Sequence, residues 1–121
     1  MQVMALIYGD RSRWESMTDE ERRAAYAEYT AFADAAGVAG VLGGGAELSS
    51  TRDATTVRVR DAQAVVTDGP YAEAKEALGG YFVLEVPTLD DAVEWAARIP
   101  GAAHGAVEIR AVHRDPEEAQ L

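Results

Sequence analysis

Residues 67–80 read Thr-Asp-Gly-Pro-Tyr-Ala-Glu-Ala-Lys-Glu-Ala-Leu-Gly-Gly. The stretch opens on a turn sequence, because aspartate can bond its own downstream backbone, glycine permits a positive φ, and proline fixes φ near the helical value. Pro70 suits the first position of a helix, so we predict a short helix that begins there and stops at Gly79-Gly80. Lys75 is the only lysine beside ten arginines. A lone lysine favours a role for its compact ammonium group.

The residues before this turn predict a β-α-β unit. Residues 3–8 are apolar on both faces, as in a central strand. Thr18-Asp19-Glu20-Glu21 is a capping box, and the apolar face that follows predicts a helix that ends at Gly37. Residues 38–42 predict a second strand. It leads into Gly43-Gly44-Gly45, which lacks the pattern of a phosphate or dinucleotide loop and predicts a bulge or bend in the sheet.

The residues on both sides of the turn complete the pattern. Residues 55–60 alternate polar and apolar side chains and are predicted to pair with residues 64–67 in a hairpin. Residues 80–86 predict a strand, and a helix follows that Thr88 opens and Pro100-Gly101 stops. Residues 107–112 predict the last strand. The order is therefore β-α-β, hairpin, β-α-β.

Two split β-α-β units predict an α+β fold, with a ferredoxin-like antiparallel sheet and both helices on one face. We assign residues 3–112 to one domain and residues 113–121 to a polar, frayed tail. The other face of the sheet needs a cover, because residues 3–8 and 81–86 are apolar on both sides. A second copy of the chain is the predicted cover, which makes a homodimer packed sheet against sheet.

Charged side chains are expected on that second face. Strand alternation places Glu85 there, and Glu108 and Arg110 occupy the same face of the last strand. Charges facing a covered surface need partners, so they either form ion pairs between strands or line a wet cavity. Trp14 is expected to cap the mouth of a pocket near the first strand, and Trp95 to pack in the core or an interface.

Composition excludes several classes of function. The 121 residues contain no cysteine, so there is no disulfide framework, thiolate nucleophile or cysteine metal site. The net charge of −10 argues against direct binding of nucleic acid. His104 and His113 lack metal-ligand spacing, and we expect no metal and no cofactor. With no long apolar run or leader sequence, we expect a cytoplasmic protein and no membrane partner.

The turn and its surroundings resemble the YCII-related domain family, and in particular its DGPF branch, whose name spells Asp-Gly-Pro-Phe. Asp68-Gly69-Pro70-Tyr71 matches this signature, with Tyr71 in place of the usual phenylalanine. Residues 6–10 with Trp14 resemble the opening of the family, and residues 107–110 resemble its close. The resemblance covers residues 3–112.

This resemblance implies a dimeric α/β barrel of ferredoxin-like topology, with a biochemical role that is largely unassigned. The histidine and aspartate proposed as catalytic in YCII-like proteins align with Tyr26 and Ala35, so that chemistry is not transferred to this chain. Genomic context of the DGPF branch implies an extracytoplasmic-function sigma factor as a partner. Related dimeric barrels also include cofactor-independent oxygenases, although no motif here requires that chemistry.

Two functions therefore stay open. In the first, a homodimer binds a small molecule in a cavity between the sheet faces, and this dimer is either a binding protein or an enzyme. Asp68 is then the candidate general base or, alternatively, only a turn-forming aspartate. The candidate ligand-binding residues are Arg58, Tyr71, Lys75, Glu76 and Glu108. In the second, the chain is a non-catalytic regulatory module that acts beside a sigma factor.

Overall fold

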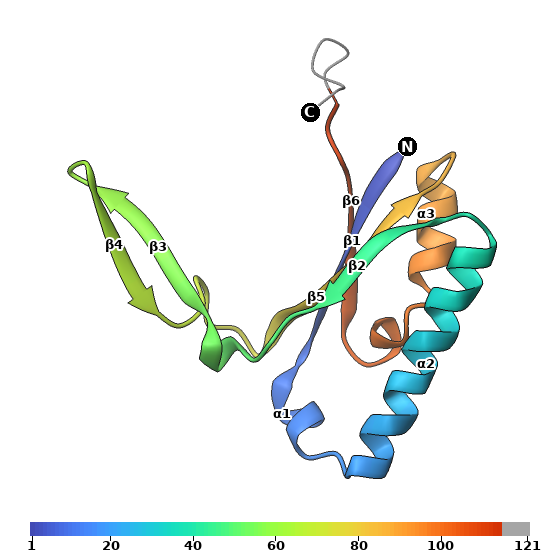
Figure 1. The fold of residues 1–121 in the computed structure, drawn as a ribbon, viewed down its shortest axis with the longest axis horizontal. Helices are drawn as coiled ribbons and strands as arrows, with labels where there is room; N and C mark the ends of the chain where they lie inside the picture. The colour runs from blue at the N-terminus through green and yellow to red at the C-terminus, as the bar shows by residue number, and fades with distance from the viewer. Residues whose placement is uncertain (115–121) are drawn as a thin grey trace.

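The computed structural model describes residues 1–114 and has the ferredoxin-like α+β fold that the sequence predicts. Four strands form the main sheet in the order β2-β5-β1-β6, and all neighbours are antiparallel. The strands are β1 (Gln2–Asp10), β2 (Leu42–Glu47), β5 (Glu76–Glu85) and β6 (Ala106–Ala111). Helices α2 (Asp19–Val38) and α3 (Leu89–Ala96) cover one face of this sheet (Figure 1).

The smaller elements lie at the ends of the main ones. Helix α1 (Arg11–Glu15) directly follows β1, and two 3₁₀ helices, η1 (Thr51–Asp53) and η2 (Pro100–Ala103), follow β2 and α3. Strands β3 (Thr55–Arg60) and β4 (Gln63–Asp68) form a separate two-stranded hairpin. In Figure 1 this hairpin projects away from α2 and α3, at the far left of the view.

The hydrophobic core fills the space between the two long helices and the sheet. Its largest fully buried side chains are Val3, Leu84 and Ile99. Phe32 of α2 packs against Phe82 of β5, with ring centroids 5.0 Å apart. These residues follow the predicted periods of two in the strands and 3.6 in the helix, which is why the element types could be predicted.

Capping residues fix where the long helices begin. Thr18 Oγ1 accepts a hydrogen bond from the Glu21 amide at 3.1 Å, and Glu21 Oε1 accepts one from the Thr18 amide at 3.0 Å. This is the predicted capping box. Thr88 caps α3 in a similar way, by accepting a hydrogen bond from the Asp91 amide. Trp95 is half-buried near Phe32, 6.2 Å between ring centroids, as expected for core packing.

The predicted helix after Pro70 is wrong. Residues 69–75 form turns and bends, and β5 already begins at Glu76, so that Gly79 and Gly80 lie inside a strand. Pairing with β1 decides this, because the register places Glu76 opposite Asp10. Gly80 is buried, and a Cβ there would lie 2.9 Å from the Ala46 carbonyl oxygen. Gly80 therefore serves sheet pairing, and neither glycine ends a helix.

Two boundaries around β2 also differ from the prediction. Helix α2 continues to Val38 instead of ending at Gly37, and Gly40, with φ of +72°, makes the turn after it. The strand begins at Leu42 and includes Gly43-Gly44-Gly45, whereas the sequence placed the strand before them. The predicted bulge is confirmed, because the β2–β5 register shifts between Leu42 and Gly44.

Candidate functional site

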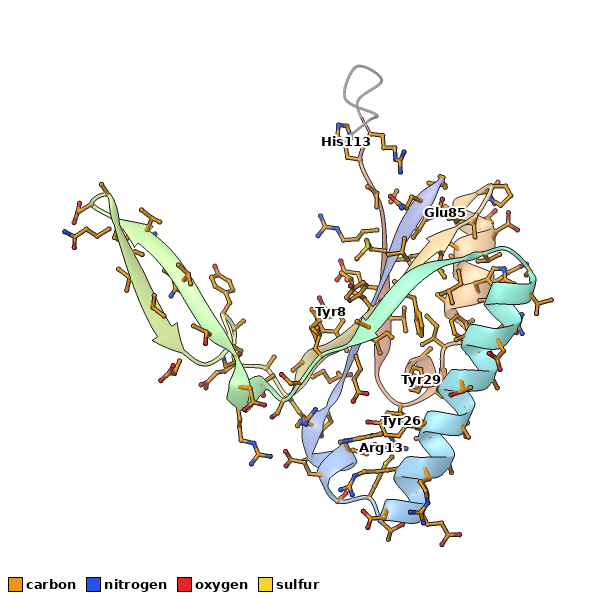
Figure 2. All side chains as sticks on the ribbon, viewed as in Figure 1. Tyr8, Arg13, Tyr26, Tyr29, Glu85 and His113 are labelled. Atoms are coloured by element: carbon orange, nitrogen blue, oxygen red, sulfur yellow. The ribbon has the colours of Figure 1, made fainter. Side chains whose placement is uncertain are left out.

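A cavity of about 640 Å³ lies between the helical layer and one end of the main sheet. Its walls come from β1, α1, α2, β2, β5 and the η2 turn, segments that are distant in the sequence. The N-terminal half of α2 forms one wall, and α1 turns back beneath it. Figure 2 shows Arg13, Tyr26 and Tyr29 gathered in the space between these helices and the sheet. The volume lies in the usual range for small-molecule pockets.

Aromatic rings form much of the cavity wall. Trp14 of α1 contacts Tyr26 of α2 edge to face, with ring centroids 5.2 Å apart. Tyr29, one turn further along α2, lies in a stacked arrangement with Phe82 of β5, at 6.4 Å. All four rings line the cavity, which confirms the expected place of Trp14 near the first strand. Rings on both sides give the cavity flat, apolar walls.

Two tyrosine hydroxyls provide polar groups on this wall. Tyr26 Oη donates a hydrogen bond to Glu47 Oε1 at 3.1 Å. Desolvation raises the pKa of Tyr26, and the hydrogen bond to the Glu47 carboxylate raises it further. Burial also raises the pKa of Tyr29, although a hydrogen bond from the Gly101 backbone opposes this. Both tyrosines are therefore neutral hydrogen-bonding groups at physiological pH.

Arginines gather at the α1 end of the cavity. Arg11 and Arg13 both line it. Arg11 Nε lies 3.7 Å from Glu15 Oε1, too far for a hydrogen bond, and Glu15 also pairs closely with Arg52. Arg11 Nε is the only buried side-chain polar atom among residues 1–114 without a hydrogen-bond partner. Arg11 Nε is therefore an unsatisfied donor, enclosed by protein atoms beside this end of the cavity.

Glycines keep the strand side of the cavity open. Ile7 and Gly9 lie on the same face of β1, and Ile7 faces η2 on the helical side of the sheet. A Cβ at Gly9 would meet no atom within 4 Å, and φ of Gly9 is not in the left-handed region. Neither packing nor backbone conformation therefore requires glycine at this position. Glycine weakens a strand, and what Gly9 provides in return is open volume.

The predicted site residues lie outside this cavity, in three separate places. Asp68 ends β4 at the base of the hairpin, where Arg58 of β3 stacks on Tyr71 with its guanidinium carbon 5.3 Å from the ring centroid. The Asp68 side chain makes no hydrogen bond within residues 1–114, so the expected side-chain-stabilised turn is absent. The turn is instead closed by Thr56 Oγ1, which donates to the Gly69 carbonyl oxygen at 2.8 Å.

The remaining predicted residues are exposed. Lys75 is near enough to Asp10 to contribute to the lowered pKa of that carboxyl, whose main cause is hydrogen bonding from Ser12. Glu76 pairs with Asp10 across β1 and β5. Glu108 lies on the open face of β6, 4.0 Å from Arg110. The structure thus brings Arg58 and Tyr71 together, and it separates them from Glu108.

The sequence reasoning missed the charged cluster that follows the first strand. Asp10, Arg11 and Arg13 come directly after a predicted central strand and before the predicted pocket-capping Trp14. That clustering at a strand end was the available signal. Glu47 could not be found in the same way, because it reaches Tyr26 only through the β2–β5 pairing, which the misplaced second strand concealed.

The fold and the cavity together define an α+β protein of ferredoxin-like topology, with a ligand-sized cavity between its helices and its sheet. The chain belongs to the YCII-related domain family, which matches residues 1–114. It is similar to the uncharacterized protein R00369 of Rhizobium meliloti (strain 1021), with 32% identity over 112 residues that cover 91% of this chain and 90% of that protein.

Two further findings concern the types of site and helix present. Within residues 1–114, His, Asp and Glu side chains form no group of three or more that could hold a metal ion. No helix of this same region has the length and apolar character needed to cross a membrane.

Proposed function

We propose that this protein binds a small molecule in the cavity between α1, α2 and the sheet. The observation that supports this function is a cavity of about 640 Å³ with aromatic walls and a few convergent polar groups. This combination is typical of small-molecule sites. Such a site lies within one chain, on the helical side of the sheet. The sequence predicts a different cavity, between the sheet faces of two chains. The six site residues predicted from the sequence belong to that second cavity.

Filling the cavity tests this function. Gly9→Val places a branched side chain in open space, in a strand where valine is favoured, so we expect the variant to fold with an equal or higher melting temperature. Gly37→Val is the matched control, because its Cβ also meets no atom within 4 Å and Gly37 does not line the cavity. Flat ring compounds bearing acid, amide or amine groups are screened by thermal shift against all three proteins.

Ligands that bind the native state raise its melting temperature. We expect at least one class of ring compound to stabilise the native protein and Gly37→Val, and to stabilise Gly9→Val less, because valine narrows the cavity. Equal stabilisation of Gly9→Val would place the binding site elsewhere and contradict the proposal. So would the absence of any stabilising compound.

We also propose that the chain is a homodimer through the face of the sheet opposite α2 and α3. Side chains of β1 and β5 on that face are mainly apolar and half-buried in the single chain, namely Met4, Leu6, Tyr81 and Val83. The hairpin exposes a second apolar surface, made by Val57, Val59 and Val66. A two-stranded hairpin is marginally stable alone, which supports its packing on a second copy.

The distribution of charge along the chain favours a second copy as the partner that covers these apolar surfaces. The hairpin strands and their turn, residues 55–68, contain two arginines and two aspartates and are neutral, so the net charge of −10 resides on the rest of the chain. A neutral arm is not repelled by the acidic body of a second copy.

A further inference from the structure

The geometry points to a ligand that carries a carboxylate on a flat ring, with the carboxylate held by Arg11 and Arg13 and the ring held by Trp14, Tyr26 and Tyr29. This inference rests on the proposed binding function and names the chemical class of the ligand. It uses the α1 end of the cavity, where basic side chains and aromatic rings meet.

Arg11 provides the first observation. Its Nε is buried and donates no hydrogen bond, although a buried donor of this kind is normally satisfied. The nearest anion, Glu15, is 3.7 Å away and is shared with Arg52. A rotation of the Arg11 side chain that turns Nε toward the cavity would give this donor a carboxylate acceptor, and the resulting charge-assisted hydrogen bond is stronger than one to a neutral group.

The acidic side chains nearby already accept hydrogen bonds, whereas Arg13 pairs with no acidic side chain among residues 1–114. Asp10 accepts hydrogen bonds from the amide and hydroxyl of Ser12, Glu21 closes the capping box with Thr18, and Glu47 accepts from Tyr26. Arg13 forms no ion pair within residues 1–114. Arg13 therefore has no direct ion-pair partner in the described part of the chain, although carboxylates outnumber the two arginines in the cavity lining.

The number of charges on the ligand follows from the same surroundings. Asp10, Glu21, Glu28 and Glu47 also line the cavity, and the chain carries a net charge of −10. A second negative charge on the ligand would face these carboxylates as well as the arginines. A carboxylate, with one charge, therefore suits the site better than a phosphate, which carries up to two.

The aromatic walls select the rest of the ligand. Trp14 and Tyr26 stand edge to face at 5.2 Å beside the arginines, and the Tyr29–Phe82 pair lies deeper along α2. A ring can pack against these faces while its acid group reaches Arg11. The hydroxyls of Tyr26 and Tyr29 are neutral donors, and neither needs to ionise for this arrangement.

The test uses two matched pairs of probes, phenylacetate with phenylacetamide and 2-naphthoate with 2-naphthamide, plus phenyl phosphate. They are titrated into the ¹⁵N-labelled full chain and followed by two-dimensional ¹H–¹⁵N NMR. We expect the acids to bind at least tenfold more tightly than the amides, as the loss of a charge-assisted hydrogen bond costs about tenfold or more. We also expect the Arg11 Nε–H signal to shift with the acids only.

Variants distinguish the contribution of the Arg11 Nε hydrogen bond from that of the positive charge. Arg11→Lys keeps the charge and loses Nε, so affinity for the acids should fall about tenfold. Arg13→Gln should reduce it about two- to fivefold, as for a solvent-accessible ion pair. Arg60→Gln, at the tip of the hairpin, is the control and should leave affinity unchanged. If Arg11→Lys fails to fold, the Nε–H signal of the native chain still shows whether the acid binds at Arg11.

The outcomes distinguish this inference from the function on which it rests. Equal binding of acids and amides, or an unmoved Arg11 signal, overturns the carboxylate inference and leaves cavity binding intact. Tighter binding of phenyl phosphate than of the acids overturns the choice of carboxylate. Acid binding that Gly9→Val leaves as tight as in the native chain overturns the proposed site itself.

Discussion

Single residues at the helix starts carry a measurable share of the stability of this fold. Thr18→Ala removes the side-chain acceptor of the Glu21 amide, and we expect a loss of about 1 kcal/mol in the free energy of unfolding. Chemical denaturation at neutral pH measures it. Ser16→Ala, which removes a surface hydroxyl just outside the box, should change the unfolding free energy much less. Equal effects of the two substitutions would contradict the importance of the cap.

The same box predicts a dependence of stability on pH. Hydrogen bonds from the Thr18 backbone and side chain lower the pKa of Glu21 from its ordinary value of 4.5. A lowered folded pKa means that the ionised carboxylate stabilises the fold above pH 4.5, and that this contribution is lost as the pH falls through the folded value. Glu21→Gln should therefore show a flatter loss of stability below pH 4.5 than the native chain. Identical acid profiles would contradict this.

At the scale of elements, close approach of backbones explains several glycines. A Cβ at Gly105 would overlap the Tyr8 carbonyl oxygen, so Gly105→Ala should force β6 away from β1. We expect a loss of about 1–3 kcal/mol, as in overpacked sites. Gly9→Ala, in the neighbouring strand, meets no atom and should not destabilise the fold. Urea unfolding of both variants checks the contrast, and equal stability would contradict it.

Elements that have a strong local sequence pattern were predicted correctly. Element boundaries that depend on the pairing of strands in the sheet were not. The capping box and apolar face of α2 and the alternation in β3 are local signals, and the structure confirms the helix and the hairpin that they predict. Pro70 is also a local signal, but the pairing of β5 with β1 overrides it from Glu76 onward. Gly79 and Gly80 resemble a helix end in the sequence, whereas in the structure both lie in β5 and Gly80 is a position of close backbone approach.

The candidate site was harder to predict than the fold, because its parts meet only in three dimensions. The cavity combines α1, the first half of α2 and the ends of three strands. Of the residues that line this cavity, Trp14 is the only one that the sequence placed beside a pocket. The turn at Asp68 was the main candidate in the sequence, yet it lies at the base of the hairpin, where Arg58 and Tyr71 contact each other.

At the scale of the whole molecule, we expect a homodimer in solution. Leu6→Glu places a charge in the middle of the apolar open face of the sheet and should convert the dimer to a monomer in sedimentation velocity experiments. Val38→Glu makes the same chemical change at the exposed end of α2, where the side chain is 92% exposed, and should leave the dimer intact. A native chain that sediments as a monomer would contradict the proposal.

A crystal structure grown with 2-naphthoate would show directly whether the cavity between α1, α2 and the sheet binds a small molecule. We expect electron density for the ring between Trp14, Tyr26 and Tyr29, with the carboxylate within hydrogen-bond distance of Arg11 Nε. A cavity closed by side chains, or naphthoate bound only at another surface such as the hairpin or the open face of the sheet, would contradict this expectation.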